Sequence, residues 1–124
     1  MGVKILYVED DEINAFLMRR YLSKWHVDLA NDAETGLKLA SVEPYKIVLL
    51  DINLGESKMT GVDAMRILKN NPLYKNSIIA AVTAYAMPED KQRFLDDGFD
   101  AYFSKPVDYP NLITFIENSL KDKS

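Results

Sequence analysis

The 124-residue chain contains no cysteine and a single histidine. The absence of cysteine excludes a disulfide scaffold, a thiolate metal site and a cysteine nucleophile. No apolar run approaches the ~20 residues needed to span a bilayer, and the first residues show no signal-peptide pattern. We therefore expect a cytoplasmic protein that does not insert into a membrane.

Basic residues are outnumbered and scattered. Lysine and arginine total 15 against 19 aspartates and glutamates, which gives a net charge of −4. No basic run is longer than Arg19-Arg20, whereas a nucleic-acid surface needs a basic stripe. Nucleic acid is therefore not an expected partner. The length fits one domain, so we expect residues 1–124 to form a single unit.

Short apolar runs alternate with amphipathic helical patterns along the whole chain. The runs are Val3–Val8, Val27–Ala30, Ile47–Leu50, Ile78–Val82 and Ala101–Phe103. Helices are expected over about 12–24, from near Asp32, Thr60 and Met87, and close to the C-terminus. This order predicts an α/β fold, a doubly wound (βα)₅ unit with a five-stranded parallel sheet and helices on both faces.

Local signals place the helix faces and ends. Ile13, Phe16, Leu17 and Tyr21 share one face of the first helix, and Leu112, Phe115, Ile116 and Leu120 share one face of the last. The segments Asn31-x-x-Glu34 and Thr60-x-x-Asp63 resemble capping boxes. Pro88 suits a first helical turn and Gly98 suits a helix end.

The residues that follow each strand carry the polar chemistry, because ligands of an open parallel sheet collect at the carboxyl ends of its strands. Glu9 and Asp10 follow the first strand, and Asp51 and Asn53 follow the third. Thr83 follows the fourth strand and Lys105 the fifth.

Converging carboxylates repel one another unless a cation lies among them. Carboxylate oxygens and a phosphoryl oxygen suit Mg²⁺, which would also screen charge during attack on phosphorus. Lys105 offers a fixed positive charge and Thr83 a hydroxyl donor for phosphoryl oxygens. Asp51 follows the most buried strand, so we expect it to be the nucleophile of a site that forms an acyl phosphate.

These segments resemble the receiver domain of response regulators in two-component signalling, over essentially the whole chain. The matching segments are Lys4–Asp11, Val48–Leu54, Ala81–Ala84 and Tyr102–Pro106. Asn14 and the stretch Thr83–Met87 further resemble receivers of hybrid histidine kinases and of stand-alone single-domain regulators.

The resemblance implies that Asp51 takes a phosphoryl group from a phosphohistidine on a histidine kinase or a histidine phosphotransfer protein. It implies Mg²⁺ held by Asp10, Asp51, the Asn53 carbonyl and, directly or through water, Glu9. It also implies strand order 2-1-3-4-5 and a cis bond from Lys105 to Pro106. Thr83 and Tyr102 would form a switch that alters a surface for a downstream effector.

The chain departs from the receiver pattern at two places. The usual Leu-Pro step is missing after Asp51, and Gly61 lies ten residues beyond that aspartate instead of eight. A loop lengthened by about two residues over 54–61 is therefore expected. At the second place, Tyr85 flanks the path of attacking water, and we predict that its ring slows loss of the phosphoryl group.

Other functions fit the residues less well. A phosphatase of the haloacid-dehalogenase type needs a second Asp where Asn53 stands, and Glu9–Glu12 would repel the phosphate of an FMN carrier. A pseudo-receiver, which is not phosphorylated and acts only as a docking module, should lack one of the five key residues. All five are present in this chain: Glu9, Asp10, Asp51, Thr83 and Lys105. His26 lies far from the strand ends and is expected to be a loop or packing residue. No output domain follows residue 124, so a stand-alone receiver and a fragment of a hybrid kinase remain open.

Overall fold

A computed structural model describes residues 3–53, 59–84 and 87–121. The strands are β1 (Lys4–Val8), β2 (His26–Ala30), β3 (Ile47–Asp51), β4 (Ile78–Thr83) and β5 (Ala101–Ser104). The helices are α1 (Glu12–Tyr21), α2 (Ala33–Val42), α3 (Gly61–Lys69), α4 (Pro88–Asp97) and α5 (Tyr109–Lys121), with a 3₁₀ turn at Pro72–Tyr74. The alternation predicted from the sequence is confirmed.

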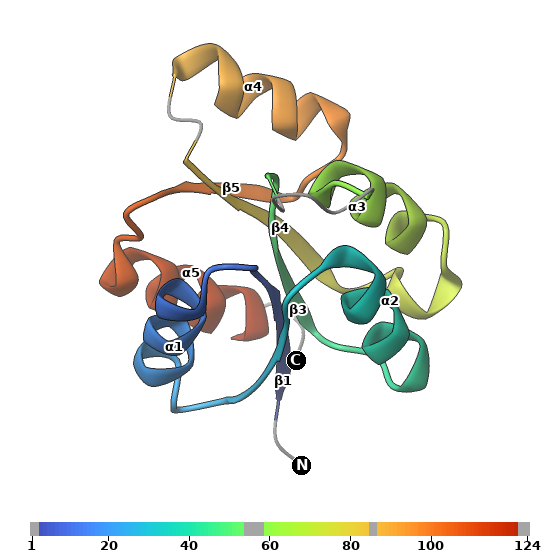
Figure 1. The fold of residues 1–124 in the computed structure, drawn as a ribbon, viewed down its shortest axis with the longest axis horizontal. Helices are drawn as coiled ribbons and strands as arrows, with labels where there is room; N and C mark the ends of the chain where they lie inside the picture. Colours follow the sequence, from blue (N-terminus) through green and yellow to red (C-terminus); the bar gives the residue numbers. More distant parts are fainter. Residues whose placement is uncertain (1–2, 54–58, 85–86, 122–124) are drawn as a thin grey trace.

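All strand pairs are parallel, and the sheet order is β2-β1-β3-β4-β5, as the resemblance implied (Figure 1). Figure 1 shows α1 and α5 on one face of the sheet, and α2 and α3 on the other, with α4 beyond β5. Central β3 is buried along its whole length because helices cover both its faces. No helix of the described residues is long and apolar enough to cross a membrane.

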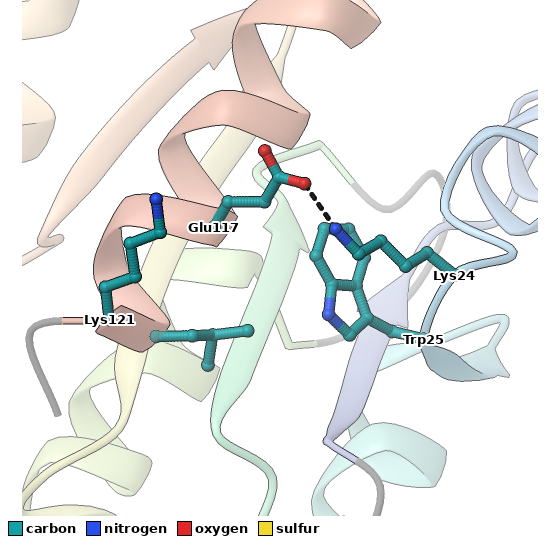
Figure 2. Close-up of a pocket in the computed structure, with 5 residues that line it drawn as sticks. Lys24, Trp25, Glu117 and Lys121 are labelled. Carbon is teal, nitrogen blue, oxygen red and sulfur yellow. Dashed lines mark hydrogen bonds and ion pairs between the residues drawn. The ribbon is translucent and has the colours of Figure 1, made fainter. Parts of the chain in front are cut away.

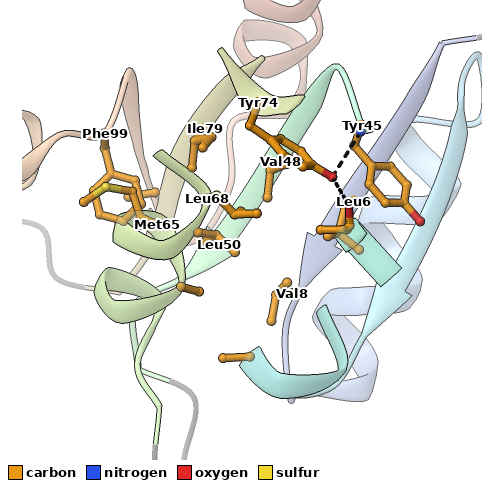
Figure 3. Packing of buried hydrophobic residues seen from close by; sticks show 14 of the residues in the cluster. Leu6, Val8, Tyr45, Val48, Leu50, Met65, Leu68, Tyr74, Ile79 and Phe99 are labelled. Atoms are coloured by element: carbon orange, nitrogen blue, oxygen red, sulfur yellow. Dashed lines mark hydrogen bonds between the residues drawn. The ribbon is translucent and has the colours of Figure 1, made fainter. Parts of the chain in front are cut away.

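The core divides into one cluster on each face of the sheet. One cluster packs alternate residues of β1 and β3 against α2 and α3, with Leu68 and Tyr74 among them (Figure 3). The other packs the intervening strand residues against α1 and α5, with Met18, Leu112 and Ile116 fully buried. Successive strand residues face opposite sides, so each face has its own set.

Most helix ends agree with the sequence signals. Thr60 caps α3 in a capping box with Asp63, Pro88 opens α4, and Gly98 ends α4 at a φ of 129°. The predicted box at Asn31 is wrong by one residue. Asp32 is the N-cap of α2, and its side chain accepts a hydrogen bond from Thr35 N at 2.7 Å.

The first helix is shorter than predicted, and it packs on the sheet through a different face. It ends at Tyr21, not near residue 24, and Leu22 is its C-cap. Ile13 and Phe16 are 71% and 60% exposed, while Met18 and Leu22 are fully buried. The helix carries two apolar stripes, and the one that packs on the sheet is not the one the sequence favoured.

Candidate functional site

Polar residues at the carboxyl ends of three strands lie on the same side of the sheet. Tyr7, Leu49 and Phe103 all pack on the side of α1 and α5. Glu9, Asp51 and Lys105 each come two residues later, so the twofold alternation of a strand carries them onto the same side. The register also aligns the strand ends, with Val8 opposite Leu50 and Asp51 opposite Val82.

The side chains of Glu9, Asp10 and Asp51 form an acidic trio. One carboxylate oxygen from each lies within 4.8 Å of the others. Glu9 and Asp51 are 3% and 4% exposed, whereas Asp10 is exposed. The trio opens into a cleft of about 380 Å³, whose lining residues also include Asp11, Asn14, Asn53, Thr83, Ala84 and Lys105. The residues predicted for catalysis and for metal binding therefore meet in one cleft.

Lys105 lies between the two buried carboxylates. Its Nζ is 2.7 Å from Glu9 Oε1 and 3.0 Å from Asp51 Oδ2. Asp51 Oδ1 accepts a hydrogen bond from Asn53 N at 3.2 Å. Burial alone would lower the pKa of Lys105, but hydrogen bonds to Glu9 and Asp51 outweigh burial and raise it. Lys105 is therefore a cation at neutral pH.

The two buried carboxylates titrate as a pair. Burial and the neighbouring Glu9 raise the pKa of Asp51 to about 7, although Lys105 opposes them. Burial would also raise the pKa of Glu9, but hydrogen bonds with Lys105, Tyr7 and Asp51 outweigh burial and lower it. Glu9 is therefore the partner that holds the negative charge most firmly.

The trio fits a hard divalent cation. Three carboxylates face one ammonium group, so the cleft keeps an excess of negative charge, and its ligand atoms are all oxygens. Mg²⁺ and Ca²⁺ both prefer such ligands, and Mg²⁺ commonly takes only one or two carboxylates along with water and phosphate oxygens. The donor set is thus the kind that binds a metal beside a phosphoryl group.

Thr83 and Tyr102 lie on the neighbouring strands. Thr83 ends β4, is 1% exposed and lines the cleft. Tyr102 on β5 is half-buried, and its ring stacks on Phe94 of α4 with centroids 6.1 Å apart. Tyr102 and Phe103 join opposite core clusters, as their adjacent positions on one strand predicted. Of the two predicted switch residues, Thr83 therefore faces the cleft and Tyr102 contacts α4.

Gly61 has a role that the sequence reading assigned only to loop length. A Cβ at this position would lie 2.2 Å from the backbone oxygen of Asp51. The start of α3 therefore approaches β3 so closely that only glycine fits. Residues 54–58 of the predicted longer loop, and Tyr85, lie outside the described residues, so both expectations stay predictions.

Sequence reasoning missed Tyr7 altogether. This residue is 1% exposed, and its hydroxyl donates a hydrogen bond of 2.6 Å to Glu9 Oε1. Tyrosine in an apolar strand is most simply interpreted as a core residue. The available signal was a hydroxyl two residues before an acid on the same face of a strand.

A larger hollow of about 440 Å³ lies at the opposite end of the sheet (Figure 2). Lys24 and Trp25 come just before β2, and Glu117 and Lys121 come from the end of α5. Figure 2 shows Lys24 paired with Glu117 beside the indole ring. Although this hollow is larger than the cleft, we do not assign the functional site to it, because its described lining lacks converging carboxylates. His26, also at this end, is exposed and pairs with Asp28.

The sequence matches known proteins along most of its length. The family model of the response regulator receiver domain matches residues 5–117. The polar-differentiation response regulator DivK of Brucella anthropi is 32% identical over 124 residues, which cover 98% of this chain and 99% of that protein.

Solved structures resemble the fold closely. The receiver domain of sensor histidine kinase PA1611 from Pseudomonas aeruginosa PAO1 has a TM-score of 0.86 at 25% identity, over 98% of this chain and 99% of that one. That structure has a magnesium ion coordinated in its active site cleft. A CheY-like receiver domain protein from Methanospirillum hungatei JF-1 has a TM-score of 0.83 at 29% identity, over 98% and 96% of the two chains.

Proposed function

The chain belongs to the response regulator receiver family, whose members accept phosphoryl groups in two-component signalling, and we propose that Asp51 is its phosphoryl acceptor. One observation carries this assignment. Asp51 is the buried carboxylate at the end of β3 that Lys105 contacts at 3.0 Å and that faces the cleft together with Glu9 and Asp10. We take residues 1–124 as a single phospho-acceptor domain.

The donor in this proposal is a phosphohistidine on a histidine kinase or a histidine phosphotransfer protein. A carboxylate oxygen of Asp51 attacks phosphorus, the new O–P bond forms, and the P–N bond to imidazole breaks. The electron pair of the broken bond stays on the imidazole nitrogen, which takes up a proton. The product is an aspartyl phosphate, a mixed anhydride that water can hydrolyse in a slow self-dephosphorylation.

Glu9, Asp10, Asp51 and the carbonyl of Asn53 would hold Mg²⁺. Bound there, Mg²⁺ would offset the mutual repulsion of the carboxylates and the charge on the phosphoryl oxygens. The magnesium seen in the PA1611 receiver supports this choice of metal. Lys105 then exchanges its contact with Asp51 for a phosphoryl oxygen, and the hydroxyl of Thr83 donates to another.

The same event would bias a switch. Movement of Thr83 toward the phosphoryl group opens space near β5, and the ring of Tyr102 turns inward from its stack on Phe94. Because that stack joins β5 to α4, the change alters the surface that these elements present. A downstream effector protein would recognise this surface.

Exposed apolar side chains beside the cleft support a protein as the donor. Ile13 and Phe16 of α1 are largely exposed, and Asn14 between them lines the cleft. A donor that inserts its phosphohistidine into the cleft must cover this part of α1. Phe16→Asp should therefore slow transfer from a phosphorylated histidine phosphotransfer protein but not from acetyl phosphate. Equal rates for wild type and variant with both donors would contradict this docking.

The proposal is tested by adding acetyl phosphate and Mg²⁺ and measuring intact mass. Wild type should gain one phosphoryl group, and EDTA should prevent the gain. Asp51→Asn should gain nothing. Asp32→Asn is the matched control, because Asp32 also follows a strand and asparagine can still cap α2. Equal labelling of Asp51→Asn and wild type would refute the assignment.

A further inference from the structure

Glu9 is held from two sides by different kinds of donor. From the cleft, Lys105 Nζ contacts Glu9 Oε1 at 2.7 Å. From within the core, the Tyr7 hydroxyl donates to the same oxygen at 2.6 Å. The other oxygen, Oε2, accepts a hydrogen bond from Asp11 N at 3.2 Å. The carboxylate of Glu9 thus has a defined orientation before any metal binds.

The two donors to Glu9 Oε1 differ in whether they keep this contact during the proposed phosphoryl transfer. Lys105 also contacts Asp51 at 3.0 Å, and under the proposed function it turns to the phosphoryl group. Tyr7 lies on β1, is 1% exposed and is not among the residues that line the cleft. Its hydroxyl can therefore stay on Glu9 throughout the reaction, while Lys105 cannot.

Tyr7 places a hydroxyl group inside its core cluster. Ile5 and Leu49, which share its core cluster, are wholly apolar and fully buried. A buried hydroxyl must find a partner, because an unpaired one is costly. Here the partner is a carboxylate of the acidic trio and not a backbone oxygen, in contrast to Tyr74, whose hydroxyl donates to the carbonyl of Ala40.

We propose that Tyr7 is a positioning residue, which holds the Glu9 carboxylate in the orientation that receives Mg²⁺ and keeps it there when Lys105 moves to the phosphoryl group. The inference rests on the proposed function. A hydrogen bond from behind a metal ligand restricts its rotation and is commonly worth a large share of metal affinity. The hydroxyl of Tyr7 acts on the metal site only through Glu9.

Calorimetric titration with Mg²⁺ tests this on unphosphorylated protein. Tyr7→Phe removes only the hydroxyl, and we expect it to weaken Mg²⁺ binding about tenfold. Tyr45→Phe is the matched control, because Tyr45 is equally buried and donates a 2.6 Å hydrogen bond to Asp28, far from the cleft. Its Mg²⁺ affinity should stay within about twofold of wild type. Unchanged affinity in Tyr7→Phe, or equal weakening in both variants, would overturn the proposal.

A double-mutant cycle separates positioning from a general loss of stability. If Tyr7 acts through Glu9, then in a Glu9→Gln background the Tyr7→Phe change should alter Mg²⁺ affinity by less than about twofold. Additive effects of the two changes would contradict the proposal.

A measurement on wild type covers the case in which Tyr7→Phe does not fold. The hydroxyl proton of Tyr7 should give a proton NMR signal that exchanges slowly with water and persists after Mg²⁺ is added. Its loss on addition of Mg²⁺ would overturn the proposal. Failure of the proposed function is distinguishable, because it would show as wild-type protein that gains no phosphoryl group on Asp51, whatever the behaviour of Tyr7.

Discussion

At the scale of single residues, the chemistry depends on how Lys105 divides its contacts. Its ammonium group lies within 3.0 Å of both Glu9 and Asp51, so it neutralises part of the charge that a metal would otherwise neutralise. Lys105 and a Mg²⁺ ion bound in the cleft would therefore repel each other, although the proposed phosphoryl transfer uses both. Removal of the Lys105 charge should therefore change Mg²⁺ affinity in a defined direction.

Lys105→Met should separate metal binding from phosphorylation. Loss of the positive charge should tighten Mg²⁺ binding by about 1 kcal/mol, roughly fivefold, because a like charge near the metal is removed. The rate of labelling by acetyl phosphate should fall, since no cation remains for the phosphoryl oxygens. Calorimetry and intact mass measure the two effects. Weaker Mg²⁺ binding in the variant would show that Lys105 supports the metal instead.

A second buried tyrosine stabilises the fold at a distance from the cleft. Burial would raise the pKa of Asp28, but hydrogen bonds from Tyr45 and His26 outweigh it and lower that pKa. An aspartate with a lowered pKa in the folded state stabilises the protein above its unfolded pKa. This stability is lost as the pH falls through the folded value.

Tyr45→Phe should therefore destabilise the protein in a pH-dependent way. At pH 7 we predict a loss of about 1 kcal/mol in the free energy of unfolding, because the hydrogen bond to a charged Asp28 is removed. The difference from wild type should shrink as the pH falls below about 4 and Asp28 becomes protonated. Urea unfolding at several pH values measures it. A constant difference down to pH 2 would exclude Asp28 as the cause.

The residues of the site could be predicted largely because strand ends converge. Asp51 and Thr83 are the last residues of their strands, and Glu9 and Lys105 directly follow theirs. Topology alone therefore brings these four residues together. Tyr7 could not be assigned in this way. It lies inside a strand, and its link to Glu9 depends on the side-chain direction that only the packed core fixes.

At the scale of elements, the start of α3 approaches β3 very closely beside the site. The start of α3 leaves no room for a side chain at Gly61, because the backbone oxygen of Asp51 lies where Cβ would be. Gly36 on α2 is also crowded, but its Cβ would meet a side-chain methyl of Val8 at 2.7 Å. A methyl group can shift more easily than a strand backbone.

The two glycines predict a graded response to alanine. Gly61→Ala should lower the free energy of unfolding by about 3 kcal/mol or more, because β3 or α3 must move. Gly36→Ala should cost about 1 kcal/mol, since Val8 can adjust and alanine favours the helix. Urea unfolding gives both values. A larger loss for Gly36→Ala would mean that the close approach at Gly61 is not the stronger constraint.

Element types were predictable, but some ends and faces were not. The apolar pattern continues through Leu22, which is fully buried although the chain has already left α1. Periodicity therefore extended the helix too far. It also could not decide between two apolar stripes on α1, because that choice depends on the packing of β1 and α5 beneath it.

At the scale of the whole molecule, folding itself assembles a cluster of like charges. Glu9 and Asp10 follow β1 and Asp51 ends β3, and these two strands pair only in the folded sheet. An ion that binds this trio therefore binds the folded state and not the unfolded chain. Such binding raises stability by mass action.

Mg²⁺ should accordingly raise the melting temperature of wild type in a concentration-dependent way. Asp10→Asn should abolish most of that rise, because it removes one carboxylate of the trio. The adjacent Asp11→Asn is the control, since it loses the same charge while asparagine can still cap α1. Thermal unfolding with and without Mg²⁺ measures the shifts. Equal shifts in both variants would indicate general screening by Mg²⁺ and no specific site.

The central claim is that Asp51 is the phosphorylated residue, and chemical mapping tests it most directly. Protein labelled with acetyl phosphate and Mg²⁺ is treated with borohydride, which reduces an aspartyl phosphate to homoserine, and its peptides are then sequenced by mass spectrometry. Homoserine should appear at position 51 and at no other aspartate. Reduction at Asp10 or Asp11, or a phosphoryl group on Thr83 that resists borohydride, would contradict the assignment.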